Sequence, residues 1–110
     1  MKVLQITRSL NPIDGGVSEG IRQITPHLTR LGAITTILTL DHPDSPWLVN
    51  NSFKAIGLGP VVGKYGYLYG LETCIKKYAL QYDVVFIHGI WQYHSLATWR
   101  ALRGTNIPYF

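Results

Sequence analysis

The chain has 110 residues, of which 46% are hydrophobic and 15% charged, and its formal net charge is +4 at pH 7. This composition excludes a disordered protein, and the longest apolar runs fall far short of the roughly 18 residues of a membrane span. The ten Lys and Arg residues are scattered rather than gathered in a stripe, so we expect no nucleic-acid partner.

The first part of the chain predicts a strand, a loop and a helix. Lys2–Thr7 is short, apolar and followed at once by breaker residues, as a buried strand would be. Residues 8–16 (RSLNPIDGG) contain Asn-Pro and Asp-Gly-Gly, which indicate a loop. A helix follows, closed by Gly32, with Pro26 predicting a bend on its solvent side. Its apolar residues recur every three or four positions and should form its buried face: Val17, Ile21, Ile24, Leu28 and Leu31.

The middle of the chain predicts two further strands separated by turn residues. Residues 33–40 (AITTILTL) are β-branched and apolar, and the segment 41–46 (DHPDSP) ends that strand. Residues 53–58 are expected to form a short third strand. The segment 57–70 carries five glycines and three tyrosines, so we expect a loop there.

The last third returns to helical and strand patterns. Leu68, Leu71, Ile75, Tyr78 and Tyr82 have helical spacing, and Cys74 is assigned to the core face of that helix. Residues 83–88 (DVVFIH) predict the clearest buried strand, followed by a loop over 89–94. Ser95 is the expected N-cap of a final helix running to Arg103. That helix should bury Leu96, Trp99 and Leu102, and residues 107–110 begin another strand.

Alternating strands and helices predict an α/β fold: a Rossmann-like, mostly parallel, doubly wound sheet with helices on both faces. Right-handed crossovers place the strand-to-helix loops along the carboxyl edge of such a sheet. The loops over 8–16 and 88–94 should therefore lie at one edge, where ligands bind. The sequence stops as a new strand begins, so we expect a domain that is incomplete at its C-terminus.

The pair Gly15-Gly16 ahead of Val17 is the first candidate binding site. Two glycines leave no side chain between a ligand and the amides of the following helix, which attract an anion such as a phosphate. The alternative is that the pair merely turns the chain. Other phosphate motifs fail: the G-x-G-x-x-G spacing is absent, and Tyr65 follows Lys64 where a P-loop needs Ser or Thr.

The second candidate is the segment His88-Gly89-Ile90-Trp91-Gln92-Tyr93-His94. His88 can hydrogen-bond a sugar hydroxyl or a phosphate, and Trp91 offers a flat apolar surface. The alternatives are a structural histidine and a core tryptophan. A metal site from His88 and His94 is disfavoured because no third ligand is spaced to join them, so we expect no metal and no other cofactor.

Together these features resemble the N-terminal half of a GT-B glycosyltransferase, in particular glycosyltransferase family 4. The resemblance rests on the opening KVLQIT, the loop ending in DGGV, the helix closing on LTRLG, and the later YDVVFIHGIWQYHS. It covers the whole chain, which is less than half of a typical member. The order and spacing of these segments, rather than any single motif, carry the resemblance.

The resemblance implies transfer of a sugar from a nucleotide-diphosphate donor to a glycan or lipid-linked acceptor, with retained anomeric configuration. Residues 1–110 would be the acceptor-side domain, facing a donor-binding domain that this sequence lacks. Gly15, Gly16 and Val17 match the family's loop near the donor diphosphate. His88, Gly89 and Trp91 match the loop that lines the acceptor side. The family's catalytic-side histidine would lie beyond Phe110, so the catalytic residues are unknown and the chain alone should be inactive.

Two other functions remain open on the residues alone: a non-catalytic α/β binding or interaction module, and a fragment of a nucleotide-sugar epimerase. The single cysteine and the absence of a signal peptide in the first residues favour a cytoplasmic location. The basic net charge and the tyrosine-rich segment suggest a further partner, the anionic inner face of a membrane.

Overall fold

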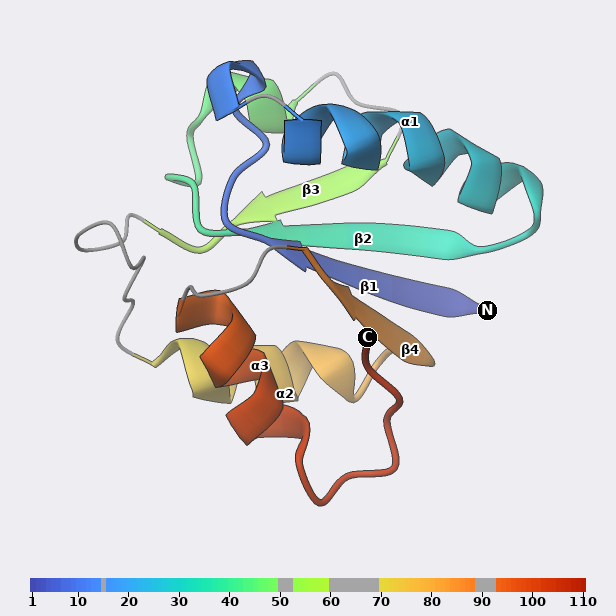
Figure 1. Ribbon diagram of the computed structural model, residues 1–110, viewed down its shortest axis with the longest axis vertical. Coiled ribbons are helices and arrows are strands. Elements are labelled where there is room, and N and C mark those ends of the chain that lie inside the picture. The colour runs from blue at the N-terminus through green and yellow to red at the C-terminus, as the bar shows by residue number, and fades with distance from the viewer. Residues whose placement is uncertain (15, 50–52, 60–69, 89–92) are drawn as a thin grey trace.

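The fold is an open α/β sheet, seen in a computed structural model that describes residues 1–14, 16–49, 53–59, 70–88 and 93–110 (Figure 1). Within these residues, four strands form a sheet in the order β3-β2-β1-β4, and each pair of neighbours is parallel. This confirms the Rossmann-like α/β class expected from the sequence. The strands are β1 (Lys2–Thr7), β2 (Ile34–Thr39), β3 (Lys54–Gly57) and β4 (Val84–Ile87).

Three α-helices cover the two faces of the sheet, as predicted. Helix α1 (Gly16–Arg30) lies on one face, and α2 (Leu71–Ala79) and α3 (Tyr93–Leu102) lie together on the other (Figure 1). Two short 3-10 turns, η1 (Pro12–Asp14) and η2 (Pro46–Leu48), precede α1 and β3. Across the described ranges, no helix has the length and apolar character needed to cross a bilayer.

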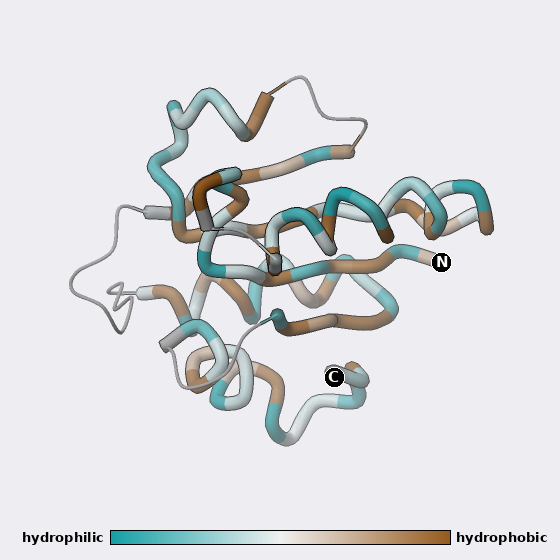
Figure 2. Tube along the Cα trace, turned by 45° about the horizontal axis from the view of Figure 1, so that its top comes forward, coloured by the Kyte–Doolittle hydropathy of each residue, from teal (hydrophilic) through white to brown (hydrophobic). Residues whose placement is uncertain are grey.

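The face under α2 and α3 holds the larger apolar core. We call it the α2–α3 core. Strand residues point into it from one side and helix residues from the other, and Figure 2 shows how apolar residues concentrate in the strands. Its most buried members are Leu4, Ile6, Leu38, Leu71, Ile75, Ala79, Val85, Ala97 and Leu102.

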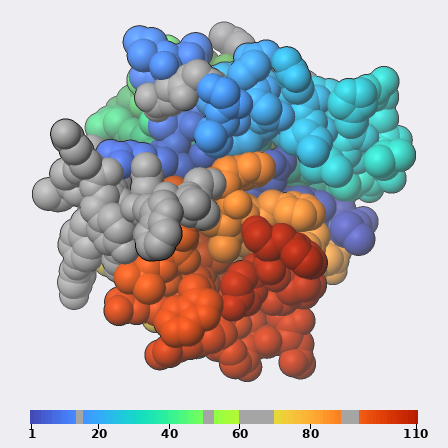
Figure 3. Space-filling view, viewed as in Figure 1, coloured from blue at the N-terminus to red at the C-terminus, as the bar shows by residue number. Residues whose placement is uncertain are grey.

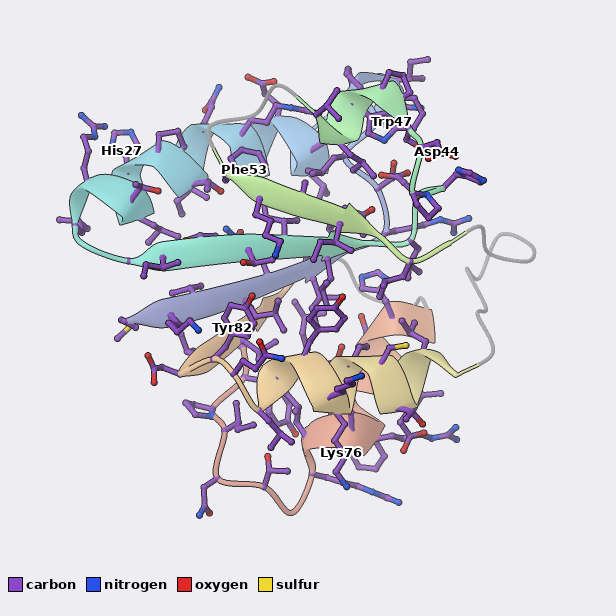
Figure 4. The ribbon with its side chains drawn as sticks, turned by 180° about the vertical axis from the view of Figure 1, so that it is seen from behind. His27, Asp44, Trp47, Phe53, Lys76 and Tyr82 are labelled. Carbon is purple, nitrogen blue, oxygen red and sulfur yellow. The ribbon has the colours of Figure 1, made fainter. Side chains whose placement is uncertain are left out.

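The face under α1 holds a smaller cluster, the α1 core. It consists of Leu10, Ile21, Ile37 and Leu48, with Trp47, Phe53 and Ala55 packed against it. Seen from behind, Trp47 and Phe53 lie on the α1 side of the sheet, and Tyr82 lies on the α2 side (Figure 4).

Helix α1 buries only part of the face that its apolar spacing predicted. Its buried residues are Ser18, Ile21 and Thr25, whereas Val17 and Ile24 are about half exposed and Leu31 is 84% exposed. Small polar side chains let the helix approach the sheet closely, and Thr25 contacts Gln5 of β1 through a hydrogen bond of 3.1 Å. In this arrangement part of the apolar stripe of the helix faces outward.

The two later helices also differ from the sequence prediction in detail. Helix α2 ends at Ala79, before Tyr82, and Cys74 is exposed rather than part of the core. Helix α3 begins at Tyr93, so Ser95 lies inside it rather than at its N-cap. Trp99 is 46% exposed, with the Arg103 guanidinium 5.1 Å from its ring centre. The small residues of α3, Ala97 and Ala101, face the core in its place, because they allow α2 and α3 to pack closely.

The last residues extend the sheet beyond β4. Tyr109 forms an isolated parallel bridge with Val85, and the backbone amide of Ile87 donates to the carbonyl of Phe110. The ring of Phe110 lies 5.7 Å from that of Phe86, measured between centres. The strand predicted to begin at Ile107 is thus represented by this short pairing.

Candidate functional site

The sheet order places a topological switch point between β1 and β4. From β1 the chain adds β2 and β3 on one side and then returns to add β4 on the other. In open α/β sheets, ligands bind outside the carboxyl ends of the strands at such a point. Ile6 and Ile87 are paired in register, so the segments that follow β1 and β4 leave the sheet side by side. The candidate site therefore combines the described residues that follow β1 with His88, which follows β4.

The surface view shows how this edge of the molecule is assembled. In Figure 3 the orange of β4 is visible between α1 above it and the C-terminal segment below it. On the face of the sheet that α1 covers, the helix thus leaves β4 partly exposed. A ligand at the carboxyl end of β4 would meet the start of α1 on one side and the start of α3 on the other.

Hydrogen bonds from the neighbouring β2 segment fix the loop after β1. The carboxylate of Asp41 accepts from the Ser9 hydroxyl at 2.6 Å and from the Leu10 amide at 3.0 Å. The Arg22 guanidinium on α1 donates to the Leu10 carbonyl. Leu10 itself is fully buried in the α1 core. This half of the site is therefore held in place by contacts to β2 and to α1.

Of the glycine pair, only Gly16 belongs to the described residues. Gly15 lies outside the described residues, and Gly16 is the first residue of α1. A Cβ built on Gly16 would meet no atom within 4 Å, so packing does not require glycine there. Val17, the third predicted residue, is about half exposed. The first amides of a helix, here those at the start of α1, have no intrahelical acceptor.

His88 is tied to β1 and, through it, to α1. Its backbone amide donates to the Ile6 carbonyl at 2.9 Å, and its ring nitrogen Nε2 lies 2.8 Å from Oε1 of Gln5. The Gln5 Nε2 atom donates to the Thr25 hydroxyl, and that hydroxyl donates to the Ile21 carbonyl at 2.6 Å. A chain of hydrogen bonds thus crosses from α1 to the carboxyl end of β4. His88 is held by these contacts, yet the residue is only partly buried.

His94, at the start of α3, contacts the backbone of His88. Its Nε2 lies 2.6 Å from the His88 carbonyl, and its side chain is 1% exposed. Burial, together with the nearby His94, lowers the pKa of His88. Burial also lowers the pKa of His94; its bond to the His88 carbonyl opposes this shift, and the charge of Arg8 reinforces it. Both rings are therefore neutral at neutral pH.

The remaining predicted residues of this segment, Gly89 and Trp91, lie outside the described residues. No three His, Cys, Asp or Glu side chains gather as metal ligands would in the portions of the chain that are described. The Nε2 atoms of His88 and His94 both contact protein oxygens.

Sequence reasoning missed three residues of this site. Gln5 and Thr25 carry the hydrogen bonds to His88, and Asp41, interpreted as a turn former, anchors the loop after β1. One signal was present in the sequence: Gln5 interrupts an otherwise apolar strand predicted to be buried. A buried amide needs partners, so its position calls for a polar neighbour on the facing helix.

No protein-family model matches the sequence, and no curated protein matches it either. Two solved structures are similar to it in fold. One is a glycosyltransferase from Rickettsia africae, with a TM-score of 0.64 and 19% identity, covering 98% of this chain. The other is the C-terminal domain of a hydrogenase from Pyrococcus furiosus, with a TM-score of 0.64 and 12% identity, covering 99% of this chain.

The two similar structures differ in how much of their own length is matched. This chain spans 28% of the glycosyltransferase and 88% of the hydrogenase domain. At these identities the similarity is one of fold. The fold is thus glycosyltransferase-like, and the same arrangement of strands and helices also occurs in a different kind of protein.

Proposed function

We propose that this chain is the N-terminal, acceptor-side domain of a retaining glycosyltransferase of the GT-B type, resembling family 4. Such an enzyme moves a sugar from a nucleotide-diphosphate donor to a glycan or lipid-linked acceptor. A second, donor-binding domain outside this sequence completes the cleft, and residues 1–110 alone do not catalyse transfer.

The observation that carries the proposal is the shared position of the two loops. The first turn of α1 and His88 follow neighbouring strands, at the switch point where α/β sheets bind ligands. A helix N-terminus favours the negative charge of a diphosphate. A neutral histidine beside it suits a sugar hydroxyl. These two chemistries in one place are what a transferase using a nucleotide sugar needs.

The sharpest test places a negative charge beside the proposed diphosphate position. Gly16→Asp and its control Gly20→Asp both add a side chain to α1 where a Cβ meets no atom within 4 Å. In the two-domain protein, Gly16→Asp should lower sugar transfer about tenfold or more by repelling the diphosphate. Gly20→Asp, one turn farther along, should transfer nearly as fast as the wild type. Full turnover in Gly16→Asp would remove the proposed role of this loop.

A non-catalytic α/β module is the second candidate function. Its support is that this chain spans 88% of the hydrogenase domain, so a fold of this size also occurs in a protein other than a glycosyltransferase. The reading frame downstream of Phe110 separates the two. A frame that encodes a second α/β domain supports the transferase, and a stop codon supports the module. With a second domain present, an assay that finds an epimerised nucleotide sugar and no transfer would identify an epimerase instead.

We further propose that the domain acts in the cytoplasm and contacts the inner face of the membrane, where lipid-linked acceptors would be reached. The net charge of +4 supports attraction to anionic lipid. The tyrosine-rich segment considered for this contact lies mostly outside the described residues. Sedimentation with anionic vesicles, compared with neutral vesicles, tests the contact. Equal sedimentation with both would remove the electrostatic contact.

A further inference from the structure

We infer that Gln5 and Thr25 are positioning residues that hold His88 with its ring proton on Nε2, so that Nδ1 meets the ligand as a hydrogen-bond acceptor. The group that His88 takes is then a donor, a hydroxyl or an ammonium, and not a phosphate or carboxylate oxygen. This inference rests on the proposed function in treating His88 as a ligand-contacting residue.

The direction of the hydrogen bonds is set at α1. The Thr25 hydroxyl lies 2.6 Å from the Ile21 carbonyl, which has only lone pairs, so the hydroxyl must donate there. Its single proton is thereby used. Toward Gln5, 3.1 Å away, the same hydroxyl can only accept. The amide nitrogen of Gln5 therefore faces Thr25.

The orientation of Gln5 then fixes the proton on His88. With its nitrogen on Thr25, the amide presents its carbonyl oxygen Oε1 to the His88 ring, 2.8 Å from Nε2. A carbonyl oxygen only accepts, so Nε2 must carry a proton. In the neutral ring, Nδ1 is left with its lone pair. Nδ1 has no hydrogen-bond partner among the residues that the structure describes.

Burial keeps this arrangement from reversing. Gln5 is 1% exposed and Thr25 is fully buried, so water cannot satisfy a rotated amide. A rotated Gln5 would turn its oxygen toward the lone pairs of Thr25, leaving two buried acceptors facing each other. The lowered pKa of His88, caused by burial and by His94, supports the uncharged ring. The charged neighbours on this edge include Arg8, whose positive charge acts in the same direction on His94.

With the proton on Nε2, the site has a hydrogen-bond acceptor at His88 and hydrogen-bond donors at the start of α1. Phosphate oxygens are acceptors, and they would meet the lone pair of Nδ1 with like polarity. The amides at the start of α1 are donors and suit phosphate. The expectation that His88 binds either a hydroxyl or a phosphate is thereby narrowed to a donor group, such as a sugar hydroxyl on the acceptor side.

The test measures the protonation of the His88 ring directly, by nitrogen-15 NMR of the imidazole in the 110-residue chain near neutral pH. In the wild type and in Thr25→Ser, the proton should be on Nε2. In Thr25→Val, which has nearly the same shape but no hydroxyl, the amide is free to rotate and a population with the proton on Nδ1 should appear. A proton on Nδ1 in the wild type overturns the inference, as does a Thr25→Val spectrum identical to the wild type.

Gln5→Glu keeps the inference testable if Thr25→Val does not fold. A carboxylate only accepts, so the proton should stay on Nε2, and the negative charge should raise the pKa of His88 above its wild-type value. A pKa that does not rise would mean that residue 5 does not contact the ring. Titration with inorganic phosphate tests which ligand His88 takes. Near neutral pH, phosphate should leave the nitrogen-15 signal of His88 Nδ1 unshifted, and a saturable shift of that signal would overturn the inference that His88 takes a donor group.

Activity separates this inference from the proposed function. In the two-domain protein, Thr25→Val should raise the KM for the acceptor about two- to tenfold, the effect of one weakened hydrogen bond, and leave the KM for the donor unchanged. Thr25→Ser should restore the wild-type value. If the two-domain protein transfers no sugar while His88 carries its proton on Nε2, the proposed function fails and the positioning role stands.

Discussion

The two faces of the sheet use the same strands for different purposes. Along β1, Leu4 and Ile6 enter the α2–α3 core, whereas Gln5 between them points toward α1 and is hydrogen-bonded to Thr25. One face holds the larger apolar cluster, and the other combines a smaller apolar cluster with the buried hydrogen bond between Gln5 and Thr25. The comparison teaches that a single strand can contribute stability through one face and orient a binding side chain through the other.

This division follows from the two-residue period of a strand. Neighbouring residues of a strand point to opposite faces, so an apolar residue and a polar residue can alternate without conflict. In β4, Val85 belongs to the α2–α3 core. His88 follows three positions later, so its side chain points to the opposite face and contacts Gln5 on the α1 side. The site and the larger core are therefore separated by the thickness of the sheet.

The largest effect is expected from a cavity in the α2–α3 core. Leu4→Ala removes a fully buried side chain and should lower the free energy of unfolding by about 3 kcal/mol. Urea denaturation followed by circular dichroism measures this. Leu80→Ala, at a position that is 70% exposed, is the matched control and should change little. Equal losses in both variants would contradict the assignment of the core.

A smaller loss is expected where two backbone segments meet at the carboxyl edge. A Cβ on Gly59 would overlap the Leu40 carbonyl oxygen, so Gly59→Ala must displace backbone and should cost about 2 kcal/mol. Gly16→Ala, where a Cβ meets nothing within 4 Å, should leave the midpoint of urea unfolding nearly unchanged. A stable Gly59→Ala would show that the edge is looser than its geometry indicates.

The anchoring of the loop after β1 can be loosened separately. Asp41→Ala removes the acceptor for the Ser9 hydroxyl and the Leu10 amide, and should cost about 1.5 kcal/mol. Hydrogen exchange at the Leu10 amide should accelerate with it. Asp44→Ala, whose side chain is 91% exposed, is the control and should leave the exchange at Leu10 as it was. If hydrogen exchange at the Leu10 amide is unchanged in Asp41→Ala, the loop after β1 is not anchored by Asp41.

The smallest effect on stability near neutral pH is expected from His88 and His94. Their pKa values lie below the ordinary 6.5, so the unfolded chain binds these protons more readily than the folded one. The free energy of unfolding should therefore fall as the pH drops below about 6.5 and level off below the folded-state pKa values. Urea midpoints measured across this range test it.

A pair of variants assigns that pH dependence. His94→Gln keeps a donor for the His88 carbonyl but removes one titrating ring, so the stability should depend less steeply on pH. His27→Gln replaces an exposed ring at the far end of α1 and is the control. If both variants retain the wild-type slope, the loss of stability in acid arises elsewhere.

The sequence was sufficient for the fold class and for the positions of the strands. The run DVVFIH and the breakers around residues 8–16 predicted β4 and the first loop because buried parallel strands have nearly continuous apolar runs. The parallel pairing then brought the two loops to one edge, as expected. These features depend on local composition, which a single sequence contains.

The face of α1 and the partners of His88 were not predictable in the same way. Helical spacing identifies Val17, Ile24 and Leu31 as apolar, but the rotation of the helix depends on which residues of the sheet lie beneath it. In the structure Gln5 lies beneath Thr25 and is hydrogen-bonded to it, a contact between residues twenty positions apart. Cys74 and Trp99 were misassigned for the same reason: their exposure is determined by the neighbouring helix.

Asp41 joins the ends of three strands. Its carboxylate binds the segment after β1, its own position follows β2, and its carbonyl accepts from the Gly59 amide after β3 at 2.9 Å. A displacement at any one of these strand ends is therefore transmitted to the other two through one residue. We therefore expect a ligand that immobilises the loop after β1 to restrict the residues after β3 as well, because both segments are hydrogen-bonded to Asp41.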